Sequence, residues 1–338
     1  MEQKKLKDEI SRGELGKLYL LYGEERFLVQ YYATEIAKGH HKDTFEGAVP
    51  AHEIMIAADT IPFSPGKRLI YVKDSNLFTA PRKADAEEIA NYLEKIPDDT
   101  TIVFIESEVD KRGRLFKKIV KMNADVYCET PAPPAMTKWI IRTMKEKGKI
   151  ISDGNANTLQ RTCGTNMANL FTEMDKLAHY LGNKTDVSSA DIKDICTPTL
   201  EARIFDLVKA MGAGNASSAL NHYRNMLFLK ESPFVILSMI IRQLRIILLC
   251  KVASEKNLPR PQIAKDLNIR DFVISEALTQ GKRFTKDELI TALKNCQDTD
   301  TKIKTGLLSP EIGVEVLLAG LSVLNVQKIF TRMIVLYL

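Results

Sequence analysis

Gly23, Glu24 and Glu25 stand where a short apolar run gives way to a helical pattern. Nucleotide-binding proteins hold phosphate at such a strand–turn–helix junction, using several backbone N–H groups, a Lys for the phosphates and a Ser or Thr for Mg²⁺. The turn here offers one Gly and two carboxylates, and no Gly-Lys-Ser/Thr follows. Two negative charges would repel a triphosphate. The residues therefore predict the strand–turn–helix of a nucleotide-binding protein without the side chains that bind phosphate and Mg²⁺.

A plainer interpretation of the same turn is an ordinary connection whose Glu24 and Glu25 favour the positive end of the helix dipole. Both interpretations agree that no ATP binds at Gly23-Glu24-Glu25. We therefore expect no cofactor and no metal at this position.

Glu106 follows the apolar run Thr101–Ile105 and stands where a Walker-B strand places the acid that holds Mg²⁺. Without a phosphate loop this carboxylate has no metal to hold, so we expect a strand-end carboxylate in solvent. The five His show no metal-ligand spacing, and no GxSxG, HExxH or Cys/His nucleophile signature occurs. The sequence predicts no catalytic residue.

The segment from Thr60 to Arg68 places two prolines and a glycine around Ile61 and Phe63. A rigid loop of this kind can present an apolar pair to a pocket on a partner protein. The alternative is that Ile61 and Phe63 pack into the core of their own domain. Spacing alone favours the alternative.

Residues 258–278 have the pattern of a helix-turn-helix, with a turn at Asn268. The second helix, predicted over Asp271–Leu278, carries no Lys or Arg and no run of Asn or Gln. A recognition helix needs such side chains to reach base edges. A structural helical hairpin is therefore favoured over a DNA-reading motif.

Composition describes an ordinary globular protein of two or three domains, with 338 residues, 45% apolar and 27% charged. The net charge of +5 is compatible with nucleic-acid contact and does not demonstrate it. The Cys residues are scattered without CxxC spacing, which indicates reduced thiols in a cytoplasmic protein and neither a zinc site nor a disulfide frame. They are Cys128, Cys163, Cys196, Cys250 and Cys296.

No targeting or membrane segment is expected. The first residues are polar and lack the apolar centre of a signal peptide. The most apolar stretch, Phe234–Cys250, is interrupted by Arg242, Gln243 and Arg245. Since an Arg at the bilayer centre costs roughly 2.5–3.5 kcal/mol, a buried core helix is the expected structure.

Strands and helices alternate over the first ~130 residues, which predicts an α/β domain with a parallel sheet. After Pro131–Pro134 only helical spacing occurs, with a second boundary at Gly212–Asn215. Ser188 and Asp191 predict a helix start, and Gly306 predicts a helix end. The predicted strands are Leu18–Tyr22, Thr44–Val49, Leu69–Val72, Thr101–Ile105 and Ala124–Cys128.

Taken in order, several segments resemble the delta subunit of the bacterial DNA polymerase III clamp loader. The resemblance covers nearly the whole chain and rests on order and spacing, because no single motif is specific. Residues Thr331–Leu338 match nothing in the family. The segments that carry it are Leu18–Glu25, Pro62-Phe63 with Lys67–Ile70, Asp110–Arg112, Ile204–Leu207, Arg242–Arg245, Ile263-Ala264 with Leu267, and Asp300–Gly306.

The resemblance implies an AAA+-like α/β domain over 1–135 without a functional phosphate loop, a helical lid over 136–211 and a helical collar over 212–338. A delta subunit of this family binds no ATP productively, so no cofactor and no catalysis of its own are expected. It would be a cytoplasmic subunit of the DNA polymerase III holoenzyme, a nucleotidyltransferase complex that acts in DNA replication. An active ATPase of the same fold and a helix-turn-helix DNA-binding protein are the alternatives.

The partners implied by the resemblance are the beta sliding clamp, the gamma/tau and delta-prime subunits, and primed DNA through the assembled complex; no membrane is implied. The implied task is to bind the clamp and stabilise its opened ring. The family's clamp-binding element, an apolar pair, falls on Pro62-Phe63, with Ile61 adjacent. The leading residue of the pair is usually a larger aliphatic, so Pro62 is a departure and Ile61 is the candidate for that part. The resemblance thus reverses the preference for a loop packed in its own core.

Overall fold

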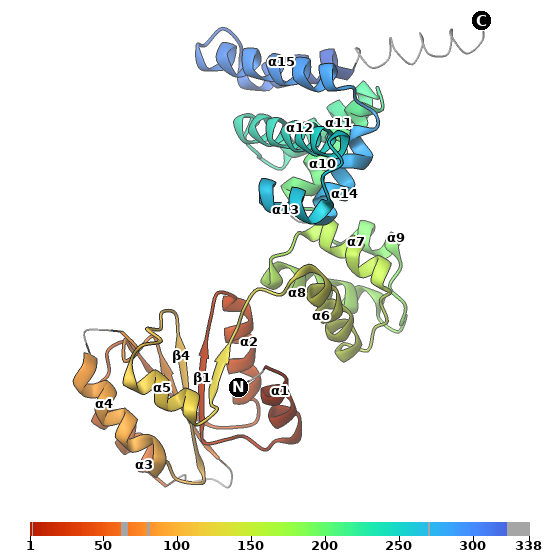
Figure 1. The fold of residues 1–338 in the computed structure, drawn as a ribbon. Coiled ribbons are helices and arrows are strands. Elements are labelled where there is room, and N and C mark those ends of the chain that lie inside the picture. The colour runs from red at the N-terminus through yellow and green to blue at the C-terminus, as the bar shows by residue number, and fades with distance from the viewer. Residues whose placement is uncertain (2, 62–66, 80–81, 270, 323–338) are drawn as a thin grey trace, which may run out of the picture. The chain divides into compact units, whose positions relative to one another are not determined.

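The structure is a computed structural model that describes residues 1, 3–61, 67–79, 82–269 and 271–322. The chain forms two compact units, Met1–Trp139 and Ile140–Leu338. The first is α/β, and the described part of the second is helical (Figure 1). The predicted class, an α/β domain followed by helical domains, is confirmed.

A parallel five-stranded sheet with the order β2-β3-β4-β1-β5 forms the centre of the first unit. Every residue of β1 and β4 is buried, as expected of central parallel strands covered on both faces. The five predicted strands all occur. They are β1 (Leu18–Tyr22), β2 (Lys42–Glu46), β3 (Arg68–Lys73), β4 (Thr100–Glu106) and β5 (Asp125–Tyr127).

The boundaries predicted for the second strand, Thr44–Val49, were wrong. β2 pairs with β3 from Lys42 opposite Leu69, and Gly47 then turns away with a φ of +76°. The Gly47 N–H donates to Lys73 O at 2.9 Å, which closes the pairing at that point. Pairing with the neighbouring strand, and not the local apolar pattern, sets the ends of β2.

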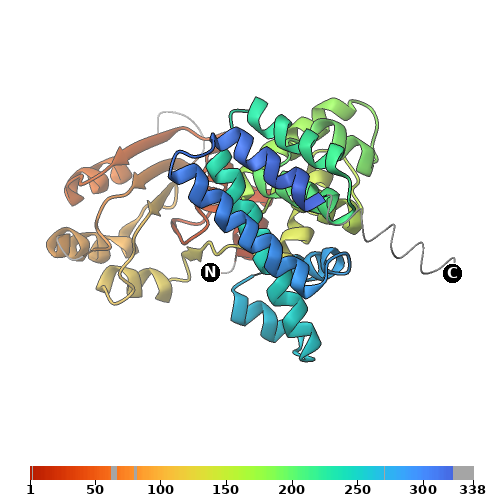
Figure 2. The same ribbon diagram turned by 90° about the horizontal axis from the view of Figure 1, so that it is seen from above.

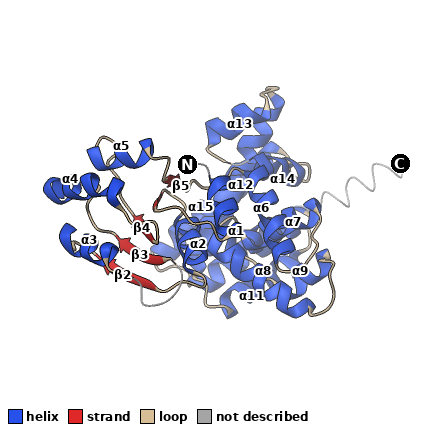
Figure 3. Ribbon diagram, turned by 90° about the horizontal axis from the view of Figure 1, so that it is seen from below, coloured by secondary structure: helices blue, strands red, loops and turns tan. Residues whose placement is uncertain are grey.

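Helices cover both faces of the sheet. In Figures 1 and 3, α3, α4 and α5 lie along one face, where Leu20, Ile102 and Phe104 of the strands enter one core cluster with Ile54 and Ile89 of the helices. α2 contacts β1 and β4, and α1 contacts β5. The helices are α1 (Gln3–Arg12), α2 (Arg26–Ala37), α3 (Ala51–Asp59), α4 (Lys83–Tyr92) with a 3₁₀ turn at Leu93–Lys95, and α5 (Arg114–Lys121).

The second unit contains no strand among its described residues, and Ile150–Asp186 is an isolated bridge. Its first helix, α6 (Pro133–Glu146), begins in the first unit, and residues 310–322 form a further helix. The others are α7 (Asp153–Cys163), α8 (Met167–Leu181), α9 (Ser189–Ile195), α10 (Leu200–Gly212), α11 (Ala216–Phe228), α12 (Pro233–Glu255), α13 (Arg260–Leu267), α14 (Asp271–Gly281) and α15 (Lys286–Lys304).

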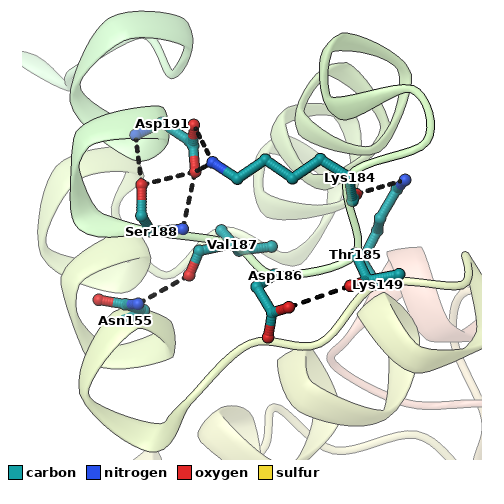
Figure 4. A network of polar contacts seen from close by, with 8 residues as sticks. All are labelled: Lys149, Asn155, Lys184, Thr185, Asp186, Val187, Ser188 and Asp191. Atoms are coloured by element: carbon teal, nitrogen blue, oxygen red, sulfur yellow. Dashed lines mark hydrogen bonds and ion pairs between the residues drawn. The ribbon is translucent and has the colours of Figure 1, made fainter.

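Polar contacts fix the segment that leads into α9 (Figure 4). Ser188 and Asp191 form a capping box, which confirms the predicted helix start. Lys184 pairs with Asp191 at 2.7 Å, while Lys149 donates to the Lys184 carbonyl at 3.0 Å and Asn155 to the Val187 carbonyl at 2.8 Å. The predicted end of α15 is also confirmed, with Gly306 at a φ of +76°.

By length and composition alone α12 could cross a membrane. It packs instead within the helical core, in contact with α10, α14 and α15, and Figure 2 shows the blue α15 beside the teal α12. The prediction of a buried core helix is confirmed. Its fully buried side chains are Ile236, Leu237, Ile240, Leu244, Ile247 and Cys250.

Candidate functional site

The carboxyl ends of the parallel strands meet at one edge of the sheet, which is where open α/β sheets bind ligands. Gly23 follows β1, Asp74 follows β3, Glu106 ends β4 and Cys128 follows β5. A nucleotide-binding protein would place phosphate here, at the N-terminus of the helix after β1. The prediction that this chain lacks a nucleotide site is therefore examined at the residues of this edge.

Backbone contacts close the turn after β1. The Cys128 N–H donates to Tyr22 O at 2.7 Å, and the Glu25 N–H donates to Cys128 O at 3.0 Å. Gly23 has a φ of +139°, and a Cβ on it would lie 2.2 Å from the Cys128 oxygen. Only glycine fits this close approach, so the glycine here serves the packing of the turn.

The two carboxylates of the turn are both engaged within the chain. Glu25 accepts a hydrogen bond from the Phe27 N–H at 3.1 Å, which caps α2. Glu24 hydrogen-bonds to Tyr127, and the Lys111 ammonium lies 4.8 Å from the centre of the same ring. The negative side chain of Glu25 thus lies at the helix N-terminus, where a nucleotide-binding protein would place a phosphate.

This geometry predicts that the chain does not bind ATP. Mg-ATP or ADP added at about 1 mM should leave the melting temperature within about 1 °C, because a ligand that binds only the folded state must stabilise it. Differential scanning fluorimetry with and without nucleotide measures this. A saturable, concentration-dependent rise in melting temperature would show that the turn opens to nucleotide.

Glu106 does not face solvent, so the expectation for it was wrong. Its side chain is 2% exposed and accepts hydrogen bonds from the Ser75 N–H at 3.1 Å and the Ser75 hydroxyl at 2.5 Å. Asp74 and Asn76 both adopt positive φ, at +43° and +59°, and this turn folds Ser75 over the carboxylate. Burial raises the pKa of Glu106 to about 7, with the Asp74 charge adding to the rise and the Ser75 hydrogen bonds and Arg26 opposing it.

The raised pKa of Glu106 predicts a pH-dependent stability. Because the folded-state pKa of about 7 lies above the ordinary value of 4.5, the folded state binds this proton more tightly. The stabilising contribution of Glu106 to the free energy of unfolding is therefore complete below about pH 4.5. It is lost as the pH rises through 7, by up to about 3 kcal/mol. Urea unfolding of Glu106→Gln at pH 5, 6, 7 and 8 should show a flatter profile than the unsubstituted chain. Parallel profiles would mean that Glu106 titrates normally.

The second candidate site is the segment after α3, from Ile61 to Lys67. Ile61 is 80% exposed, so the alternative in which it packs into its own core does not hold for this residue. Pro62 and Phe63 lie outside the described residues. Hydrogen bonds hold both ends of the segment, because Arg68 of β3 donates to Thr60 O at 2.8 Å and Lys67 donates to Leu15 O.

Two family models match the chain. The DNA polymerase III, delta subunit model matches residues 19–129, and the model of the C-terminal domain of the DNA polymerase III delta subunit matches residues 201–321. Together they cover more than half of the 338 residues. The chain belongs to the DNA polymerase III delta subunit family.

Two similar proteins span nearly the whole delta-family chain. DNA polymerase III subunit delta of Bacillus subtilis (strain 168) is 24% identical over 328 residues, which are 92% of this chain and 94% of that protein. The solved structure of the Bacillus subtilis DNA clamp loader delta protein (YqeN) superposes with a TM-score of 0.64 at 23% identity, over 94% of this chain and 99% of that one. The structural likeness agrees with the fold described above.

The helical hairpin of the delta-family chain is part of its core. α13 and α14 contact each other, Asn268 ends α13 in the left-handed conformation, and α14 also packs on α12. Ile263 and Ile274 are buried in the same cluster as the residues of α12. The predicted structural hairpin is confirmed, and its apolar contacts favour it over a DNA-reading motif.

The structure also brings together a side-chain cluster that the sequence did not predict. Donor atoms of Cys163, Glu173 and Cys196, from α7, α8 and the end of α9, lie within 4.8 Å of one another and are buried. Glu173 is held by Lys176 at 2.8 Å and by the Thr197 N–H at 3.0 Å. The described residues offer no fourth ligand side chain, and the Lys176 ammonium already pairs with the Glu173 carboxylate. The cluster is therefore a poor metal site, and it connects three helices.

A cavity of about 580 Å³ lies among α7, α10 and α12. Two ion pairs lie in its walls, Arg242 with Glu201 at 2.8 Å and Arg161 with Glu276 at 3.6 Å. Among the described residues that line the cavity we find no catalytic constellation. Among the described residues, the closed turn at Gly23 and the exposed side chain of Ile61 are the two features that bear on function.

Proposed function

We propose that this chain is the delta subunit of a clamp loader, which binds the sliding clamp through the loop that starts at Ile61 and stabilises the opened ring. Membership of the DNA polymerase III delta family supports the role. The observation that carries the mechanism is the 80% exposed side chain of Ile61, which follows the C-cap of α3, a helix whose last turn is bonded to β4 through the Thr100 hydroxyl and Ala58 O. An exposed apolar side chain on a rigid support suits insertion into a pocket.

Clamp opening in this proposal is a shift of population. If the chain binds the open ring more tightly than the closed ring, the difference in binding free energy favours opening without hydrolysis at this subunit. The closed turn at Gly23 supports a mechanism without ATP hydrolysis at this subunit, since Glu25 caps the helix N-terminus at which a nucleotide would bind. Hydrolysis then belongs to the gamma/tau subunits of the assembly.

The wider organisation follows the same proposal. The first unit acts as an AAA+-like domain, residues 136–211 as the lid and residues 212–338 as the collar that joins gamma/tau and delta-prime. Primed DNA is reached through the assembled complex in the cytoplasm, and the chain itself catalyses no reaction.

Release of clamps from DNA tests the proposal. Sliding clamps loaded on a nicked circular plasmid and freed of loader should leave the DNA faster when the purified chain is added without ATP. The fraction retained is measured by gel filtration against time. An unchanged lifetime at saturating chain would contradict the proposed stabilisation of the open ring.

A further inference from the structure

Two free thiols lie next to each other in the second unit. The Sγ atoms of Cys163 and Cys196 are within 4.8 Å of one another, and the Cys163 thiol hydrogen-bonds to Cys196. Both side chains are buried, and all five cysteines of the chain are free. Because a disulfide joins two sulfurs at about 2.05 Å, a small side-chain movement is enough to bring this pair to bonding distance.

The backbone brings the two cysteines together without help from the thiols. Cys163 is the last residue of α7, and Cys196 directly follows the last residue of α9. The Thr199 N–H donates to Thr162 O at 2.9 Å, which bonds the segment after Cys196 to the end of α7. The Asn169 side-chain amide donates to Cys163 O at 2.7 Å and holds this end on α8. The pair is therefore preorganised, and rotation of the side chains can join the two sulfurs.

A small oxidant can approach the pair from the cavity of about 580 Å³ among α7, α10 and α12. Gly164 follows Cys163, Pro198 lies two residues after Cys196, and both line this cavity. Since the side chains of the two cysteines are only 1% and 4% exposed, a bulky reagent is excluded from them. Hydrogen peroxide, a molecule little larger than water, belongs to the class of oxidant that fits this approach.

The surroundings keep Cys163 protonated at rest. Its hydrogen bond with Cys196, its burial and the charges of Cys196 and Glu173 raise the pKa of the Cys163 thiol well above its ordinary value, and Lys176 opposes the rise. A protonated thiol attacks an oxidant slowly, because the thiolate is the nucleophile. Cys163 therefore suits the second step of disulfide formation, in which its proton leaves as part of a water molecule.

We propose that Cys163 and Cys196 are a site of reversible oxidation, at which a peroxide forms a disulfide between the ends of α7 and α9. The Cys196 sulfur attacks one oxygen of hydrogen peroxide and breaks the O–O bond, which leaves a sulfenic acid on Cys196 and releases water. The Cys163 sulfur then attacks the sulfenic sulfur, and the hydroxyl group leaves with the Cys163 proton as a second water. The two thiols lose two electrons, and the peroxide gains them. This oxidation is independent of the clamp-binding role proposed above.

The disulfide would constrain residues 163–196, which contain α8 and α9. A cross-link stabilises a protein chiefly because it restricts the unfolded chain, and the effect grows with the length of the closed loop. The oxidised chain should therefore melt about 5 °C higher than the reduced chain. Dithiothreitol, which reduces disulfides, should reverse this rise.

Peptide mapping of the full chain tests the site directly. The reduced chain is treated with hydrogen peroxide, the remaining thiols are blocked with N-ethylmaleimide under denaturing conditions, and trypsin is added without reductant. Cys163 falls in the tryptic peptide 162–176 and Cys196 in the peptide 194–203, each with a single cysteine. Most of the oxidised chain should yield these two peptides linked and lighter by two hydrogens, and dithiothreitol should separate them.

Alanine variants provide the controls. Cys250→Ala removes another buried thiol of the same unit and should leave the linked peptides unchanged. Cys163→Ala should abolish the link and leave a sulfenic acid on Cys196, which dimedone traps. Because the linked peptides are measured in the unsubstituted chain, the test does not depend on the folding of any variant.

Three results would overturn the proposed site. One is a native chain in which peroxide leaves the two peptides unlinked. Another is linkage of Cys250 or Cys296 as frequent as that between Cys163 and Cys196, which would indicate oxidation of unfolded chain. The third is a linked chain that melts below the reduced chain, since the bond would then be incompatible with the native positions of the two sulfurs.

Discussion

Replacing Phe63 with alanine is expected to weaken binding to the sliding clamp at least about tenfold. Burying one aromatic side chain in an apolar pocket contributes roughly 1.5–3 kcal/mol, and 1.4 kcal/mol corresponds to a factor of ten in affinity. Ile61→Ala should also lower the affinity, since the proposed function gives Ile61 the part of the aliphatic residue in the pair. Titration calorimetry against the purified clamp measures both variants.

Phe228 is a matched control for this prediction. It is an aromatic side chain that is 86% exposed, at the end of α11 in the other unit. Phe228→Ala should keep the clamp affinity of the unsubstituted chain, and all variants should keep its melting temperature. Unchanged affinity in Phe63→Ala would remove the loop from the clamp interface.

Gly23→Ala is expected to destabilise the first unit by about 3 kcal/mol or more. The added Cβ would lie 2.2 Å from a backbone oxygen of Cys128, and a φ of +139° is one that other residues rarely adopt. Both the clash and the strained conformation then act on the connection between β1 and β5, and effects of this size come from such sites. Urea unfolding followed by circular dichroism gives the change.

Gly39→Ala separates the two causes. Gly39 also has a positive φ, +75°, but no atom lies within 4 Å of the position of its Cβ. Its substitution should therefore cost only about 1 kcal/mol, the strain of the backbone alone. Equal losses for the two variants would mean that the turn at Gly23 relaxes away from Cys128.

The parallel sheet was predictable because its central strands are buried on both faces and read as continuous apolar runs. β1 and β4 carry this signal directly, whereas β2 has alternating exposure and its ends depend on pairing with β3. The burial of Glu106 could not be predicted, since it depends on a left-handed turn at Asp74 that local patterns do not indicate.

The candidate site was predictable in part for a similar reason. The missing Lys-Ser/Thr and the two carboxylates at Glu24 and Glu25 are local facts of the sequence, so the lack of phosphate-binding side chains at this turn could be read directly. The bond between Arg68 and Asp43 joins residues 25 positions apart, and only the pairing of β2 with β3 brings them together. Contacts of this kind follow from the fold and leave no spacing signal.

Equilibrium binding without nucleotide tests the central claim most directly. The purified chain, titrated into fluorescently labelled sliding clamp in the absence of ATP, should bind saturably, and adding Mg-ATP should leave the affinity unchanged within about twofold. The proposed function predicts this result, because the proposed contact with the clamp starts at Ile61 and the turn at Gly23 is closed by backbone hydrogen bonds. Absence of binding, or binding that appears only with ATP, would contradict it.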